Sequence, residues 1–161
     1  MYIFPSLDRG SIPRSSTIYN SLLISPMMKK KIFLSGPIRG ISRHDSLSWR
    51  KEATLLLNNK FNIIHALRGR EKRETFTDPK TAVIRDLNDI VNSDIILVND
   101  SIENCSMIGT FMEVFFAYQQ NKPVIIFGNA HEKDYWLDYH SHLRTSSLIE
   151  ACYVLNTMFN E

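Results

Sequence analysis

Residues 31–40 read KIFLSGPIRG, a short apolar run that gives way to glycine, proline and arginine within three residues. An apolar run of this length, ended by turn residues, predicts a buried strand. Gly36 and Gly40 would let the backbone come close to a ligand, and Arg39 offers a planar fork for phosphate. We therefore expect this loop to form the floor of a site for an anionic, nucleotide-like ligand. A tight surface turn with an exposed arginine is the alternative.

Apolar runs and helical patterns alternate along the rest of the chain. Further strands are expected at residues 61–66, 94–99 and 122–128, with a short one near Leu143. Because these strands are continuously apolar and alternate with helices, they predict a parallel sheet covered on both faces. The expected fold is α/β, a flavodoxin-like doubly wound sheet of four or five strands with helices on both faces.

Four helices are expected between and after these strands. The first is capped by Asp45 and carries apolar residues at Trp49, Ala53, Leu56 and Leu57. The second begins at Asp78-Pro79, a cap followed by proline at the first helical position, and runs to about Asn92. The third covers residues 109–120, and the fourth follows a capping box formed by Ser147 and Glu150.

Composition narrows the class of protein. The chain has 161 residues, 43% hydrophobic and 22% charged, with a net charge of only +2, which gives no case for a nucleic-acid binder. No apolar run approaches the length of about 18 residues that spans a bilayer, so no membrane partner is expected. Cys105 and Cys152 fit no metal or disulfide pattern, which favours the cytoplasm. Residues 1–28 are expected to form a flexible or loosely packed arm, and residues 29–161 one domain.

In doubly wound folds, ligands bind outside the carboxyl ends of the strands. This rule selects residues 35–40, 66–70, 99–109 and those from 128 onward. Arg68 and Arg70 could then reach a phosphate, unless they belong to a solvated loop of mixed charge. Asn99 could orient a nucleophile or a sugar hydroxyl, or be only a polar strand end.

Glu113 is the only charged residue in the segment 107–118, MIGTFMEVFFAY. An ionised carboxylate among such side chains costs several kcal/mol unless it is compensated. The nearby helix N-terminus favours an anion, and a carboxylate kept ionised at the edge of a cleft suits a nucleophile. The alternatives are a glutamate paired with a core arginine, or one that reaches the rim.

Asp86 is a second acid in an unexpected place. It shares a helix face with the apolar stripe of Val83, Leu87, Ile90 and Val91, whereas Asp89 is expected in solvent. Asp86 could accept a hydrogen bond from a backbone N–H, or it could be the acid partner of Glu113. Glycosyl transfer needs two such carboxylates, one to attack the anomeric carbon and one to help the leaving base depart.

Three segments, IFLSGPIRG, RDLNDIVNSDIILVN and GTFMEVFFA…KPVIIFG, resemble the nucleoside 2-deoxyribosyltransferase superfamily, including its 2′-deoxynucleoside 5′-monophosphate N-glycosidases. The resemblance covers roughly residues 31–128, and residues 136–140 add support. It implies a homo-oligomer with sites completed near subunit contacts. It also implies a catalytic Glu113 in the GT-x-ME motif, an active-site Asp86, and a first loop that holds sugar and phosphate through Ser35, Gly36, Ile38, Arg39 and Gly40.

One position departs from the superfamily pattern. Six residues before the catalytic glutamate, the transferases have an acid that contacts the sugar, and the monophosphate hydrolases tend to have a serine. This chain has Met107 there, with Ser106 one place earlier. Either the loop shifts so that Ser106 acts, or the contact is absent. Gly109 is counted with the substrate-binding residues.

The predicted activity is cleavage of the N-glycosidic bond of a (2′-deoxy)nucleoside or its 5′-monophosphate. Glu113 would form a covalent glycosyl intermediate, and water or another base would accept the sugar. Tyr139 and His140 could close over the base, from the same or a neighbouring subunit. No metal or other cofactor is expected. The alternatives are a TIR-like NAD glycohydrolase and a non-catalytic module that senses a nucleotide.

Overall fold

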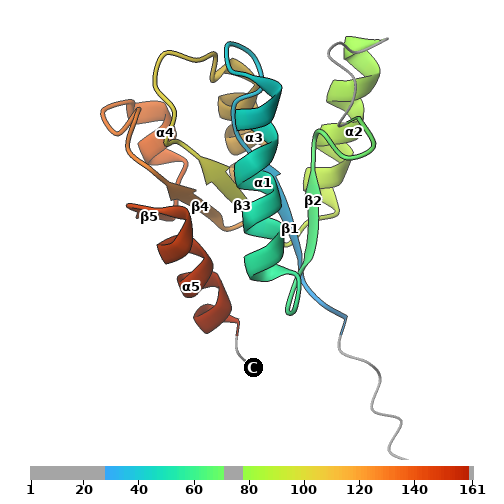
Figure 1. Ribbon diagram of the computed structural model, residues 1–161, viewed down its shortest axis with the longest axis vertical. Coiled ribbons are helices and arrows are strands. Elements are labelled where there is room, and N and C mark those ends of the chain that lie inside the picture. Colours follow the sequence, from blue (N-terminus) through green and yellow to red (C-terminus); the bar gives the residue numbers. More distant parts are fainter. Residues whose placement is uncertain (1–27, 71–77, 160–161) are drawn as a thin grey trace, which may run out of the picture.

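A five-stranded parallel sheet forms the centre of the computed structural model, which describes residues 28–70 and 78–159 (Figure 1). The strands are β1 (Lys31–Ser35), β2 (Asn62–His65), β3 (Ile95–Asn99), β4 (Val124–Phe127) and β5 (Leu143–Thr145). Their order, β2-β1-β3-β4-β5, is that of flavodoxin-like folds and confirms the predicted class. Of the predicted N-terminal arm, residues 1–27 lie outside the described residues.

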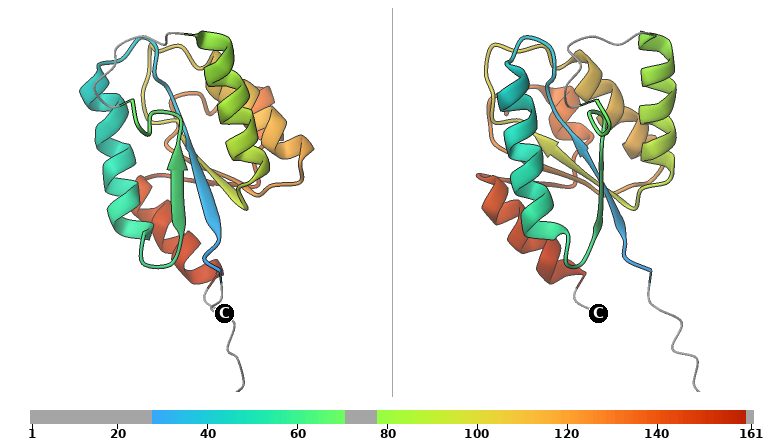
Figure 2. Two further views of the ribbon diagram at one scale, coloured as in Figure 1. Left: turned by 90° about the vertical axis from the view of Figure 1, so that its right-hand side faces the viewer. Right: turned by 45° about the vertical axis from the view of Figure 1, so that its right-hand side comes forward.

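Helices cover both faces of the sheet, as predicted (Figure 2). On one face lie α1 (Arg43–Leu57) and α5 (Leu148–Met158), whose apolar residues share a core with Ile32, Leu34 and Leu97. On the other lie α2 (Pro79–Val91), α3 (Ile108–Gln119) and α4 (Tyr135–Tyr139), packed on a core that contains Phe33 and Val98. The side chains of β1 alternate between these two cores because successive residues of a strand point to opposite faces.

Two of the predicted helix starts are confirmed. Asp78 caps α2 with proline at the first helical position, and Ser147 caps α5 by accepting a hydrogen bond from the backbone N–H of Glu150. The cap predicted for α1 is wrong. Ser42 is the cap, and its hydroxyl accepts from the N–H of Asp45, which lies in the first turn. A further short helix, α4, contains Trp136 and was not among the four predicted helices.

The predicted orientation of α2 needs correction. Val83, expected to face the core, is 57% exposed, whereas Asp89, expected in solvent, is buried. The reason is a long-range ion pair in which Arg68 at the end of β2 donates two hydrogen bonds to the Asp89 carboxylate. This pair allows an acid to lie on the inner face of the helix.

The order of the strands reverses between β1 and β3, because the chain crosses first to β2 on one side and then to β3 on the other. A crevice is expected at this point, outside the carboxyl ends of the two strands. Within the described ranges, no helix combines the length and apolar character needed to cross a membrane.

Candidate active site

A cavity of about 320 Å³ lies at this switch point, between the loop after β1, helix α2 and the first half of α3. It brings together seven of the residues predicted from sequence: Gly36, Ile38, Arg39, Asp86, Ser106, Gly109 and Glu113. Five further lining residues were not predicted: Pro79, Ala82, Val83, Ile108 and Thr110.

Glu113 lies on α3 and reaches the cavity wall, where its Oε2 accepts a hydrogen bond from the hydroxyl of Ser35. The residue is partly exposed, but its carboxyl group is enclosed, and this burial raises its pKa to about 7. The Ser35 hydrogen bond and the charge of Arg50 oppose the rise, and Asp86 adds to it. The expectation of a carboxylate that stays fully charged is therefore corrected. Near neutral pH both forms of Glu113 are present.

Asp86 extends from α2 into the same cavity. Burial raises its pKa, and two arginines oppose this. Its Oδ1 lies 3.4 Å from a terminal nitrogen of Arg85 and 3.9 Å from one of Arg70. The cavity therefore contains two acids whose pKa values are both raised, a pattern typical of catalytic sites.

Arg50 of α1 is a buried residue that the sequence analysis missed. It is 1% exposed, donates to the carbonyl of Gly36 (2.9 Å) and to the hydroxyl of Ser46 (3.1 Å), and lies 4.5 Å from the centre of the Trp49 ring. Burial lowers its pKa to about 10, against the charges of Glu113 and Asp86. A signal was present in the sequence. Arg50 lies three and seven residues before the buried Ala53 and Leu57, so it shares their helix face.

The first loop fits closely against its neighbours. A Cβ on Gly36 would lie 2.8 Å from the Trp49 ring and 2.9 Å from the Cβ of Asn99, so only glycine fits there. Gly40 has a φ of 83°, a backbone conformation that glycine adopts readily. Its neighbour Arg39 accepts a backbone hydrogen bond from Ser106 (3.2 Å), which ties the first loop to the loop before α3.

The hydrogen bond between Ser106 and Arg39 concerns the position six residues before Glu113, where this chain departs from the superfamily pattern. Ser106 lies in the cavity wall, whereas Met107 is 5% exposed and serves as the N-cap residue of α3 without a side-chain hydrogen bond. Ser106, and not Met107, therefore lines the cavity, and its contact with a ligand stays a prediction.

Several predicted residues lie outside the cavity lining. Ser35 is buried behind Glu113, and Arg68 is paired with Asp89. Asn99 is buried, and its side-chain oxygen accepts from the N–H (2.9 Å) and hydroxyl (2.7 Å) of Ser101. No group of three or more His, Cys, Asp or Glu residues able to hold a metal occurs in residues 28–70 and 78–159.

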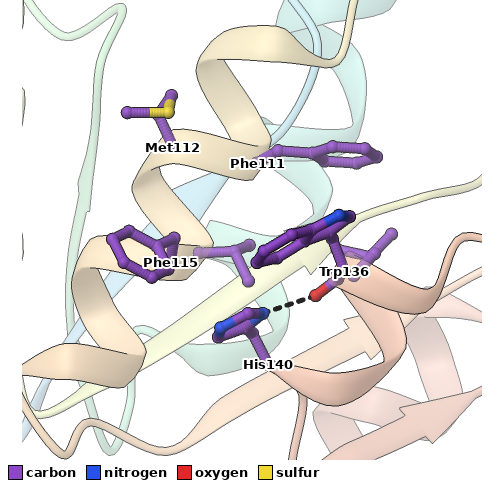
Figure 3. Close-up of a pocket in the computed structure, with 7 residues that line it drawn as sticks. Phe111, Met112, Phe115, Trp136 and His140 are labelled. Atoms are coloured by element: carbon purple, nitrogen blue, oxygen red, sulfur yellow. Dashed lines mark hydrogen bonds between the residues drawn. The ribbon is translucent and has the colours of Figure 1, made fainter.

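His140 lines a second cavity, of about 280 Å³, between α3 and α4 (Figure 3). His140 stacks on Trp136 at 5.8 Å between ring centres and hydrogen-bonds to the Trp136 carbonyl through Nδ1 (2.6 Å). Tyr139 is exposed and packs against Tyr118. The chain therefore does not bring these two residues to Glu113, and their contribution from a neighbouring subunit stays a prediction. The second cavity is lined by Phe111, Met112, Val114, Phe115, Trp136, Leu137 and His140.

Solved structures with the same fold include two enzymes that act on nucleosides or nucleotides. The 2-deoxyribosyltransferase of Bacillus psychrosaccharolyticus is 18% identical, with a TM-score of 0.61 over 74% of this chain and 88% of that one. The CMP N-glycosidase BcmB of Clostridium botulinum is 17% identical, with a TM-score of 0.56 over 81% of this chain and 100% of that one.

The same fold also occurs in a protein of another kind. DNA processing protein A of Helicobacter pylori, which binds single-stranded DNA, is 10% identical, with a TM-score of 0.55 over 80% of this chain and 81% of that one. No family model matches the sequence, and no curated protein matches it. At these identities the comparisons show a shared fold, so the function must be argued from the cavity.

Proposed function

We propose that the protein cleaves the N-glycosidic bond of a nucleoside or nucleoside 5′-monophosphate, with Glu113 as the nucleophile. One observation carries this proposal: an enclosed carboxyl group lies beside a second acid in a cavity at the switch point of the sheet. The fold shared with a 2-deoxyribosyltransferase and a CMP N-glycosidase supports the same chemistry.

In the first step, an oxygen of ionised Glu113 forms a bond to C1′ while the bond from C1′ to the base nitrogen breaks. The electron pair of that bond leaves with the base, which takes a proton from Asp86. Burial raises the pKa of Asp86, which favours the protonated form that donates to the leaving base. The nearby carboxylate also stabilises the positive charge that develops on the sugar ring.

In the second step, water or another base attacks C1′ and releases the sugar from Glu113. Ionised Asp86 then accepts the proton of the attacking water, which restores both acids to their starting states. Transfer to a base and hydrolysis differ only in the acceptor, so the same two carboxylates serve either outcome.

We propose a 5′-monophosphate, in preference to an uncharged nucleoside, as the substrate. The first residues of α3, from Ile108 to Thr110, line the wall, and the N-cap residue Met107 supplies no side-chain hydrogen bond. The free N–H groups of such a helix end attract anions. Arg39 and Ser106 lie in the same wall and would complete a phosphate site.

A base-release assay tests the proposed function. The protein is incubated separately with dCMP, dGMP, CMP, deoxycytidine and NAD, and the free base is measured by chromatography. We expect release from at least one monophosphate and much slower release from deoxycytidine. Nicotinamide release from NAD alone would favour the TIR-like alternative. Thermal stabilisation by a nucleotide without release of any base would favour a sensing module.

We also propose that the protein is a homo-oligomer. Large apolar side chains are exposed along one side of α3 and α4, among them Met112 (62%), Trp136 (69%) and Tyr139 (71%). A second copy that covers them would bury this apolar surface and could place Tyr139 and His140 near the other subunit's cavity. Light scattering after size-exclusion chromatography measures the oligomeric state. Salvage or turnover of nucleotides in the cytoplasm is the setting we propose for this activity.

A further inference from the structure

Ser35 stands at the carboxyl end of β1, in the middle of the sheet, and is 1% exposed. Its hydroxyl donates to Oε2 of Glu113, across 78 residues of sequence. It does not belong to the lining of the cavity, whose wall begins with the next residue, Gly36. The hydroxyl therefore contacts the Glu113 carboxyl group from a buried position in the sheet and not from the cavity wall.

We infer that Ser35 is a positioning residue that fixes the Glu113 carboxylate and keeps it available for attack. This inference rests on the proposed function and goes beyond it, because Ser35 was expected to bind the substrate. A hydroxyl on Oε2 leaves Oε1 as the oxygen that reaches C1′. It also restrains rotation of the carboxyl group, which holds the attacking oxygen in one orientation.

The hydrogen bond also acts on the charge of Glu113. A donor favours the ionised form of a carboxyl group and so lowers its pKa, against the burial that raises the pKa of Glu113. In the second step the sugar leaves and Glu113 regains its negative charge, which the same hydroxyl stabilises. Ser35 therefore assists both the ionisation that precedes attack and the release that follows it.

Other charged groups act on Glu113 from the surrounding elements. Asp86 faces it from α2 and raises its pKa, whereas Arg50 acts from α1 and lowers it. Arg39, from the first loop, lies in the same cavity wall. Within residues 28–70 and 78–159, Ser35 lowers the pKa of Glu113 through a hydrogen bond, whereas Arg50 lowers it through its charge. A change at position 35 therefore removes this contact and leaves the surrounding charges in place.

The test compares Ser35→Ala and Ser35→Cys with the parent and with Ser93→Ala. Cysteine keeps the shape of serine with a larger sulfur atom in place of the oxygen, and it donates more weakly. Ser93 is a matched control because it is also 1% exposed, and its hydroxyl donates to the carbonyl of Asp89 (2.7 Å) instead of to Glu113. Thermal melts establish that each variant folds.

The first readout needs no substrate. The pKa of the Glu113 side chain is measured by NMR titration of protein labelled with ¹³C at the glutamate carboxyl groups, with Glu113→Gln used to assign the signal. We expect a value of about 7 in the parent and in Ser93→Ala. Ser35→Ala should raise it by about one pH unit, with Ser35→Cys in between. An unchanged or lower value in Ser35→Ala would overturn the inference.

The second readout is the pH profile of base release. At pH 7, kcat for Ser35→Ala should fall about fivefold, the loss of ionised Glu113 that one pH unit causes. It should approach the parent above pH 9, with KM unchanged. A raised KM with an unmoved acidic limb would instead place Ser35 in contact with substrate and overturn the inference. If neither the parent nor any variant releases base while the NMR shift appears, the proposed function fails and the role of Ser35 in ionising Glu113 stands.

Discussion

Helix α3 separates two cavities of similar size and opposite character. The first, of about 320 Å³, lies at the ends of β1 and β3 and contains Glu113 and Asp86. The second, of about 280 Å³, lies against α4 and is lined by aromatic and aliphatic side chains with His140. Phe111 and Phe115 flank Glu113 in sequence, but because each is two residues away they face the opposite side of the helix.

This contrast shows that size alone does not assign a function to a cavity. Both cavities could hold a small molecule. Only the first lies at the switch point of the sheet, and only there does burial act on two neighbouring acids. An enclosed acid is costly for the fold, so its presence in the first cavity is best explained by chemistry. The apolar lining of the second cavity is instead typical of a surface that contacts another subunit.

The largest expected effect comes from Glu113→Gln, which removes the attacking oxygen and keeps the shape of the side chain. Base release should fall by about a thousandfold or more, as measured by chromatography with the best monophosphate. Glu150→Gln is the control, since Glu150 lies in the first turn of α5 and binds Ser146. Equal activity in Glu113→Gln and the parent would remove the nucleophile from the account.

A smaller loss is expected from Asp86→Asn, because the amide cannot donate a carboxyl proton to the leaving base. We expect a fall of about a hundredfold in kcat, which substrates with better leaving groups should partly restore. Asp94→Asn is the control, since Asp94 accepts from the backbone N–H of Lys31 (2.7 Å) at the other end of the sheet. If the loss were the same for every leaving group, Asp86 would not be the acid.

The pH dependence should follow the ionisation of Glu113. With a pKa of about 7, the ionised form of Glu113 rises about tenfold between pH 6 and pH 8 and sets the acidic limb of kcat/KM. Loss of the proton that Asp86 gives to the base sets a separate alkaline limb. An acidic limb that lies well below pH 6 would show that Glu113 is already ionised in this range and that burial does not control it.

Ionisation of Glu113, which favours base release, is expected to lower the stability of the folded protein. The pKa of Glu113 is raised in the folded protein from 4.5 to about 7, so the folded state binds more protons than the unfolded chain. The contribution of the Glu113 carboxyl group to the free energy of unfolding is therefore complete below pH 4.5 and is lost as the pH rises through 7. We expect Glu113→Gln to melt at a higher temperature than the parent at pH 8, and this difference to shrink at pH 5.

The smallest effect on catalysis should come from the second cavity. Leu137 of α4 is 1% exposed and lines that cavity. Leu137→Ala should lower the free energy of unfolding by about 2 to 4 kcal/mol, measured by denaturant titration. In the folded variant, the acidic limb of the pH profile should stay in place. A shift of that limb would mean that the two cavities are coupled through α3.

Much of the fold followed from local patterns in the sequence. The apolar runs predicted all five strands, and Asp78-Pro79 and Ser147 marked two helix starts correctly. Local patterns failed where the packing of a helix depends on a residue far away in the sequence. The face of α2 that packs inward depends on Arg68 reaching Asp89, and no spacing within α2 contains that information.

In the candidate site too, some residues were predicted from the sequence and others were missed. Seven of its lining residues were predicted, because the rule for strand ends and the isolated acids point to one edge of the sheet. Arg50 was missed because a single arginine in a helix is usually assigned to solvent, although its spacing to Ala53 placed it on the buried face. The aromatic residues Tyr139 and His140 lie beyond α3, which the sequence did not reveal.

Trapping of the covalent intermediate tests the role of Glu113 most directly. A 2′-deoxy-2′-fluoroarabinosyl nucleoside 5′-monophosphate is suitable, since its fluorine slows both steps by destabilising positive charge on the sugar. After incubation, intact-mass and peptide mass spectrometry should find one sugar phosphate attached to Glu113 in the parent and none in Glu113→Gln. Release of base with the sugar attached to another residue, or to none, would contradict a glutamate nucleophile at this position.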